Sequence, residues 1–138
     1  MTDDADSPMV SVSDRQETAV DAGALTELAR ETLRGERAGP VELSVSLVTK
    51  DEMTDLHRRY LDEEGATDVL SFSMDEDGLL GDVVICPDVA AGQSDDLAAE
   101  LRLLLVHGIL HLLGYDHEEE EERLAMWARQ EGYSGVRI

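Results

Sequence analysis

The sequence predicts a single α+β domain, because it contains stretches with the two-residue period of a strand and stretches with the spacing of an amphipathic helix. In residues 41–48, apolar side chains occupy every second position from Val41 to Leu47. In residues 21–37, leucines and alanines recur at helical spacing. With 138 residues, 42% of them hydrophobic, the chain can bury a core and is unlike a disordered acidic protein.

The first part of the chain divides into a tail and four elements. Residues 1–8 are expected to form a disordered acidic tail, and residues 9–138 a single domain. We expect an edge strand at 9–13, a helix at 21–37, a strand at 41–48 and a helix to about Tyr60. Thr49 and Glu52 fit a capping box at the start of that second helix.

The second part begins with a predicted hairpin. Strands at 69–74 and 79–86 flank a turn at 75–78, and a short helix follows Pro87. Ser94 is the expected cap of a long helix that ends near Leu113. A last helix is expected at 118–130, with Leu124 and Trp127 facing inward.

The net charge is −21, from 32 acidic and 11 basic residues. Molar salt shortens the Debye length to about 3 Å and removes most of such self-repulsion. We therefore interpret the composition as salt adaptation, with an ordinary well-solvated acidic surface as the alternative. The charge also argues against generic nucleic-acid binding, which depends on Lys and Arg, although a local basic cluster could still reach RNA.

Several features favour a cytoplasmic protein that binds neither a membrane nor DNA. The N-terminus lacks the basic and apolar regions of a signal peptide, and no apolar run is long enough to span a membrane. Cys86 is the only cysteine, which excludes an internal disulfide. We expect Cys86 to be a small buried hydrophobic residue.

Three of the four histidines lie within residues 107–117. His107 and His111 are four residues apart, so on a helix they share one face. Gly114 can adopt the left-handed conformation that ends a helix, and the turn could return His117 as a third nitrogen. Three imidazoles predict a divalent metal site, with zinc as the leading candidate. The alternative is an accidental arrangement of core or surface histidines.

The histidine spacing matches the zinc-ligand pattern of the metzincin metallopeptidases at His107, His111, Gly114 and His117. Those peptidases carry glutamate directly after the first histidine, as the general base. Here that position is Gly108, which cannot transfer a proton. A purely structural zinc is disfavoured, because such sites usually close with four protein ligands, mostly cysteines.

The sequence resembles the YbeY family of ribosomal-RNA maturation endoribonucleases. The resemblance rests on the histidine motif at 107–117, on Thr-Asp-Val-Leu-Ser-Phe at 67–72, and on Leu-Gly-Asp-Val-Val-Ile-Cys at 80–86. These motifs follow the family's order and spacing across roughly residues 40–132. Gly108 is also the family's residue, which accounts for the missing glutamate.

The resemblance implies a zincin-like fold: a small mixed β-sheet covered by helices, with a central helix that carries the metal ligands. It implies one Zn²⁺ per chain and a hydrolase that cuts single-stranded RNA. Its expected roles are maturation of the 3′ end of small-subunit ribosomal RNA and ribosome quality control. The implied partners are the ribosomal RNA precursor and the small ribosomal subunit with its proteins.

The expected catalytic group is a zinc-bound water held by His107, His111 and His117, because three neutral imidazoles leave zinc its full positive charge. The resulting hydroxide would attack phosphorus, or the metal would promote attack by the neighbouring ribose 2′-hydroxyl. Asp116 is a candidate base, and an aspartate beside a ligand histidine is equally often an orienting group.

Many family members carry an arginine directly after the tyrosine that corresponds to Tyr60, and this sequence has Leu61 there. A cation at that place would stabilise negative charge that develops in the transition state. Arg58 and Arg59 are candidate substitutes, although solvated helix surface is their more ordinary role. His57 is expected to lie on the surface.

Two other functions stay open at this point. One is a small zinc metallopeptidase or amidase, against which Gly108 is the evidence. The other is a non-enzymatic ribosome-associated protein with a structural zinc, against which the open coordination position argues. An assay that compares RNA with peptide substrates separates the three functions.

Overall fold

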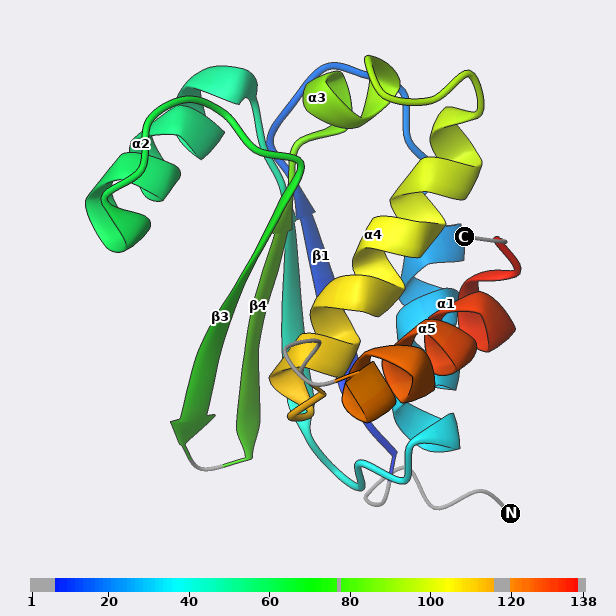
Figure 1. Cartoon of the computed structure of the whole chain (residues 1–138). Coiled ribbons are helices and arrows are strands. Elements are labelled where there is room, and N and C mark those ends of the chain that lie inside the picture. Colours follow the sequence, from blue (N-terminus) through cyan, green and yellow to red (C-terminus); the bar gives the residue numbers. More distant parts are fainter. Residues whose placement is uncertain (1–6, 77, 116–119, 137–138) are drawn as a thin grey trace.

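The computed structural model describes residues 7–76, 78–115 and 120–136. Within these ranges the chain forms a four-stranded mixed sheet and five helices, which confirms the predicted α+β class. The elements are, in chain order, β1 (Met9–Asp14), α1 (Ala22–Gly35), β2 (Glu42–Leu47), α2 (Lys50–Leu61), β3 (Val69–Glu76), β4 (Leu79–Ile85), α3 (Pro87–Ala91), α4 (Leu97–Leu112) and α5 (Glu120–Ser134) (Figure 1). Residues 1–6 of the predicted tail lie outside the described residues.

The sheet has the order β1-β2-β4-β3. β1 and β4 both pair with β2 in parallel, and β3 pairs with β4 in antiparallel register as the predicted hairpin. The parallel pairs need crossover connections, which α1 supplies between β1 and β2. β1 and β3 are therefore the edge strands, which confirms the edge strand expected at residues 9–13.

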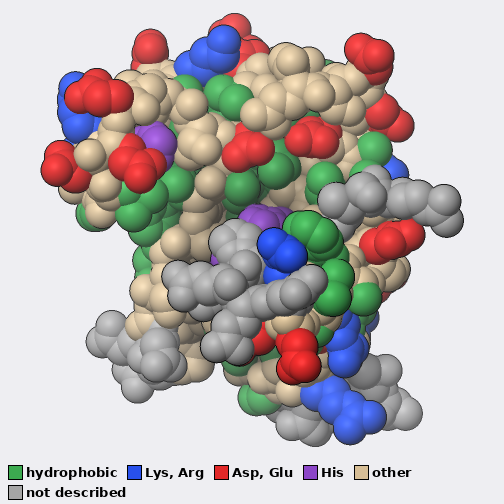
Figure 2. All heavy atoms as spheres, in the orientation of Figure 1, with side chains coloured by type: hydrophobic (Ala, Val, Ile, Leu, Met, Phe, Trp, Pro, Cys, Tyr) green, Lys and Arg blue, Asp and Glu red, His purple; other side chains and the backbone are tan. Residues whose placement is uncertain are grey.

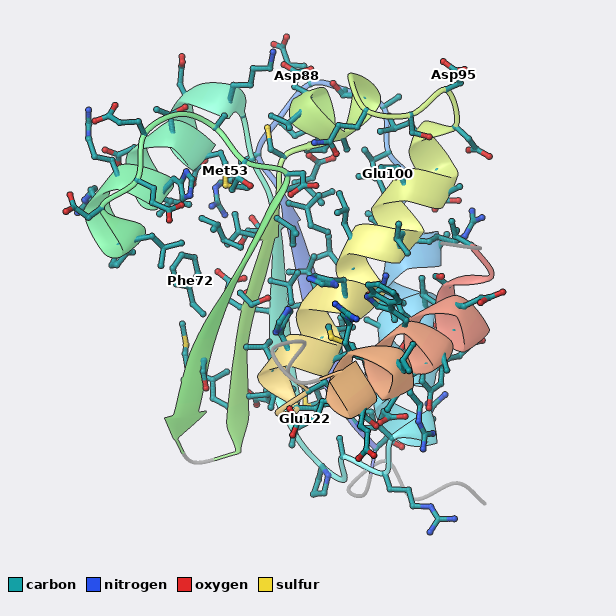
Figure 3. The ribbon with its side chains drawn as sticks, in the orientation of Figure 1. Met53, Phe72, Asp88, Asp95, Glu100 and Glu122 are labelled. Carbon is teal, nitrogen blue, oxygen red and sulfur yellow. The ribbon has the colours of Figure 1, made fainter. Side chains whose placement is uncertain are left out.

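The helices divide between the two faces of the sheet. α1, α4 and α5 cover one face, and α2 lies on the other (Figure 1). Alternation along β2 and β4 sends Val45 and Val83 into the helix-covered core and Val84 toward α2. Met53 points from α2 toward the sheet, where it is buried with Val84 and Cys86 (Figure 3). Cys86 is fully buried, as predicted.

α4 is the most buried helix of the described chain, because its apolar side chains face both the sheet and the neighbouring helices. Leu105, Ile109 and Leu110 have no exposed surface, and α4 packs between β3, β4, α1 and α5. No described helix is both long enough and apolar enough to cross a membrane.

The two predicted helix starts differ in outcome. Thr49 caps α2 by accepting a hydrogen bond from the Glu52 backbone N–H at 3.2 Å. The Glu52 side chain does not complete the capping box, because it binds Arg15 at 2.6 Å instead. The prediction that Ser94 caps α4 is wrong. Asp96 caps the helix by accepting from the Ala99 N–H at 3.1 Å, and Ser94 stabilises the preceding turn through the Asp96 N–H.

The predicted orientation of the last helix is also wrong. Leu124 and Trp127 were expected to face inward, but they are 54% and 39% exposed. The buried residues of the described part of α5 are Met126, Gln130 and Ser134. Gln130 is buried because its amide bonds to His107 across the helix interface, and this tertiary contact fixes the rotation of α5 about its axis.

Candidate metal centre

His107 and His111 lie one turn apart on α4 and line the same pocket. Their ring centroids are 4.5 Å apart, and the ring planes meet at 77°. The helical spacing therefore brings together the two imidazoles that the sequence predicts as neighbours.

Gln130 fixes the orientation of His107. The Gln130 side chain is almost fully buried, and its Oε1 lies 2.8 Å from His107 Nδ1. Because a carbonyl oxygen only accepts, Nδ1 must carry the proton and donate it. The lone pair of a neutral His107 then lies on Nε2, the arrangement that metal-binding histidines usually obtain from such a partner. Nothing in the sequence marks Gln130 as this partner.

The end of α4 is a Schellman turn built on Gly114. Gly114 has a φ of 101°, which favours glycine, and its N–H donates to the His111 carbonyl at 3.0 Å. The Tyr115 N–H donates to the Leu110 carbonyl at 3.0 Å, which completes the motif. The chain therefore leaves the helix at the residue that the sequence predicts, two positions before Asp116 and three before His117.

Asp116 and His117 lie outside the described residues, so the predicted third ligand and the candidate base have no assigned position. Among the described residues, no cluster of three His, Cys, Asp or Glu side chains is arranged to hold a metal. The described pair fits a metal by its donor chemistry, because His107 is held in the tautomer with a lone pair on Nε2 and His111 lies beside it.

Glu36 joins the end of α4 to α5. Its side chain is only 7% exposed, although it is a carboxylate at the C-terminus of α1. It accepts hydrogen bonds from the hydroxyls of Tyr115 at 2.5 Å and Tyr133 at 2.6 Å, and it pairs with Arg129 at 3.3 Å. These bonds fix the chain immediately before Asp116 and hold α5 in the position that presents Gln130.

The two tyrosines act as neutral donors to Glu36. The hydrogen bond to Glu36 raises the pKa of Tyr115, and burial adds to the effect. Burial, followed by the bond to Glu36, raises the pKa of Tyr133. Both hydroxyls therefore keep their protons well above neutral pH, and the contacts with Glu36 persist there.

The pocket beside the histidines has a volume of about 400 Å³. Its wall is formed by Leu61 at the end of α2, by Val69, Leu70, Ser71 and Ser73 on the edge strand β3, and by His107, His111 and Leu112 on α4. On the face in Figure 2, histidine atoms reach the surface between the lobe containing α2 and the region of α4 and α5. The pocket is therefore open to solvent and accessible to an extended ligand.

Leu61 lies in this pocket with the two histidines, so the side chain at the position of the family arginine does reach the candidate site. Among the described residues that line the pocket, none is Lys or Arg. Arg58 and Arg59 do not line it; both are strongly exposed and pair with Asp55, at 3.4 and 3.2 Å. The geometry therefore supports the surface role of these two arginines.

Gly108 lets α4 pack closely against the sheet. A Cβ atom built there would lie 2.7 Å from Val83 Cγ1 and 3.1 Å from Ser71 Oγ. Ser71 Oγ also donates to the Gly108 carbonyl at 3.2 Å. Packing therefore excludes the glutamate that the peptidases carry, and Gly108 is both a missing base and a structural requirement.

His57, which was expected on the surface, is partly exposed, with 12% of its side chain accessible. Its Nδ1 lies 3.0 Å from the Gly65 carbonyl and its Nε2 lies 2.7 Å from Glu63. His57 thus ties α2 to the following loop, a contact that the sequence did not reveal because both partners lie on a loop that folds back onto the helix.

Two carboxylates lie together beyond the pocket. The Gln93 amide, oriented to suit its acceptors, has its nitrogen 3.2 Å from Glu100 and 3.1 Å from Asp68. Burial raises the pKa of Glu100, and the nearby charge of Asp68 raises it further. Figure 3 shows Glu100 on the N-terminal half of α4, away from α5. These groups belong to the packing of α3 on α4 and do not touch the histidines.

The chain matches the family model described as "Endoribonuclease YbeY" over residues 11–135. It is 50% identical to "Endoribonuclease YbeY" of Frankia alni over 130 residues, covering 80% of this chain and 72% of that protein. Identity to the protein of the same description is 45% in Thermobifida fusca, with 88% of each chain covered, and 43% in Streptomyces griseus, with 88% and 85% covered.

The fold is similar to the solution structure of a protein from Thermotoga maritima. The TM-score is 0.68 at 30% sequence identity, and the match covers 91% of this chain and 87% of that one. The chain therefore shares its arrangement of sheet and helices with this solved structure.

Proposed function

Since the chain belongs to the YbeY endoribonuclease family, we propose that it is a zinc-dependent, single-strand-specific endoribonuclease that matures the 3′ end of small-subunit ribosomal RNA. Family membership makes it a hydrolase that acts on RNA. The observation that carries the zinc dependence is the bond from His107 to Gln130, which leaves Nε2 as a metal donor beside His111.

We assign one Zn²⁺ per chain to His107, His111 and His117. Zinc in such a site supplies Lewis acidity, which activates water near neutral pH and polarises a phosphoryl oxygen. Gln130 holds the His107 ring in place, and Glu36 holds the helix that carries Gln130. Asp116 stays a candidate base because of its position beside His117 in the sequence.

The pocket supports an extended RNA strand as the ligand. It lies along the edge strand β3 and is open to solvent on the face that carries the histidines. Because no described residue that lines it is Lys or Arg, the phosphate charge must be met by the metal and by cations outside the lining. Arg58 and Arg59 do not line the pocket and pair with Asp55 on the surface of α2, which disfavours them for this role.

We also propose a role in ribosome quality control in the cytoplasm, with the ribosomal RNA precursor and the small subunit and its proteins as partners. This follows from family membership and from an RNA substrate that is part of the small subunit. A metallopeptidase activity is disfavoured, because the packing of Gly108 against Val83 leaves no room for the glutamate base.

The test is an incubation of the zinc-loaded protein with a 3′-extended ribosomal RNA precursor and, separately, with an unstructured peptide. We expect cleavage of the RNA only, and loss of that cleavage in His111→Ala. Equal RNA degradation by wild type and His111→Ala would show contamination. Cleavage of the peptide without cleavage of the RNA would replace the proposed activity with that of a peptidase.

A further inference from the structure

Trp127 is the only tryptophan of the chain, and it lies exposed on α5 close to the candidate metal centre. It precedes Gln130 by three residues, which is about 4.5 Å along a helix axis. Because Gln130 contacts His107 directly, the indole lies within roughly one helical turn of the residue that orients the first histidine. Packing within the described chain does not explain why this large hydrophobic side chain is exposed here.

Arg123 stacks on that indole. Its guanidinium carbon lies 5.2 Å from the centre of the Trp127 ring, within the range of a cation–π contact. Arg123 Nε is buried and has no hydrogen-bond partner among the described residues. No carboxylate of the described residues forms an ion pair with the Arg123 guanidinium. Its positive charge is therefore available to an anion, whereas Arg58, Arg59 and Arg129 are bound to carboxylates.

Along α5, the exposed Trp127 and the partly buried Arg123 lie beside the buried Gln130 that contacts His107. Arg123, Trp127 and Gln130 follow the i, i+4, i+7 spacing of a single stripe. Arg129 and Tyr133 lie on the other flank, where they bind Glu36 of α1. Figure 2 shows basic and hydrophobic side chains directly beside the histidine atoms on this face.

We propose that Trp127 and Arg123 form a nucleotide-binding subsite for the single-stranded RNA substrate, in which the indole stacks on one base and Arg123 binds the adjoining phosphate; this rests on the proposed activity toward RNA. Aromatic stacking suits unpaired bases of any sequence, because every base has a π face. A free arginine beside the ring suits the phosphate that follows the base. Arg123 supplies a positive charge that matches the phosphate in a chain whose net charge is −21.

The first test uses the fluorescence of Trp127, which reports on this site alone because the chain has no other tryptophan. Full-length His111→Ala is titrated with a single-stranded oligoribonucleotide and with an oligomer of the same length that has abasic sites. We expect saturable quenching by the first and none by the second. RNA binding that leaves the indole fluorescence unchanged would refute stacking.

The second test compares variants on one helix by the kinetics of RNA cleavage by the zinc-loaded protein. Trp127→Ala should raise KM about 5- to 150-fold with kcat nearly unchanged, and Trp127→Phe should restore most of the loss. Arg123→Gln should reduce the slope of log affinity against log salt by about one. Leu124→Ala removes an exposed hydrophobic side chain without a ring and should leave KM unchanged.

The outcomes separate the subsite from the activity. If wild type cleaves RNA and Trp127→Ala does so with an unchanged KM, the subsite is refuted and the endoribonuclease stands. If wild type cleaves no RNA, the proposed function itself has failed. Equal effects of Trp127→Ala and Leu124→Ala would indicate a hydrophobic docking surface for a protein and would also refute the nucleotide subsite.

Discussion

Replacing Gly108 with alanine should destabilise the protein, although alanine normally favours a helix. In a helix interior, alanine gains about 0.5–1 kcal/mol over glycine. Here the new Cβ would lie 2.7 Å from Val83 Cγ1, a fully buried side chain with no free direction in which to move. Overpacking of this kind costs about 1–3 kcal/mol. We expect a net loss of about 1 kcal/mol in the free energy of unfolding.

Gly132→Ala is the matched control. Gly132 lies in α5, and a Cβ atom there would meet nothing within 4 Å. Gly132→Ala should therefore raise the free energy of unfolding by the helix preference of alanine over glycine alone, about 0.5–1 kcal/mol. The double variant Gly108→Ala with Val83→Ala should lose less stability than the sum of the two single variants, because removal of the valine methyls makes room for the new Cβ.

Urea unfolding followed by circular dichroism measures all four variants on one scale. Stabilisation by Gly108→Ala equal to that of Gly132→Ala would refute the close approach of α4 to the sheet. Strict additivity in the cycle with Val83→Ala would refute Val83 as the cause of the strain. Either result would also reopen the position to the glutamate of a peptidase.

Three further predictions concern the metal, pH and salt. Gln130→Leu should weaken zinc affinity about 10- to 100-fold, measured by competition with a chelator, because His107 loses the acceptor that fixes its tautomer; unchanged affinity would contradict that role. Burial raises the pKa of Asp82 above its ordinary value of 3.8. The stabilisation of the folded state by the protonated Asp82 carboxyl is therefore fully present below pH 3.8 and is lost as pH rises through the folded-state pKa. Asp82→Asn should therefore raise the free energy of unfolding at pH 7 and not at pH 3, and an equal effect at both would contradict this. Unfolding free energy should rise with KCl as the charge of −21 is screened, and equal stability in dilute and molar salt would refute salt adaptation.

The strands and the helix that carries the histidines were predictable because their signals are local. Apolar residues alternate along β2 because one face packs into the main helix-covered core, although the strand is also largely buried on its other face. The caps and terminal glycines act within one turn of the chain. The error at the start of α4 has the same local nature. Ser94 and Asp96 both suit a cap, and only the fold decides which of them lies at the first turn.

The residues that hold the two histidines and α5 in place, Glu36 and Gln130, could not be predicted from one sequence. Glu36 is one of 32 acidic residues, and its tyrosine partners lie 79 and 97 positions away. Gln130 is a polar residue in a highly charged helix, and its burial depends on a histidine 23 positions earlier. For the same reason the inward face of α5 was misassigned, since Leu124 and Trp127 are its obvious hydrophobic residues and both are exposed.

The most direct test of zinc-dependent cleavage titrates zinc into metal-free protein and measures the rate at which a fluorogenic single-stranded RNA is cut. The rate should rise until one zinc per chain is present and then stay constant, while the same RNA in a duplex stays intact. His107→Ala and His111→Ala should lose tight zinc binding and cleavage together. Full cleavage by chelator-treated protein, or by either histidine variant, would contradict a reaction that depends on a metal held by these histidines.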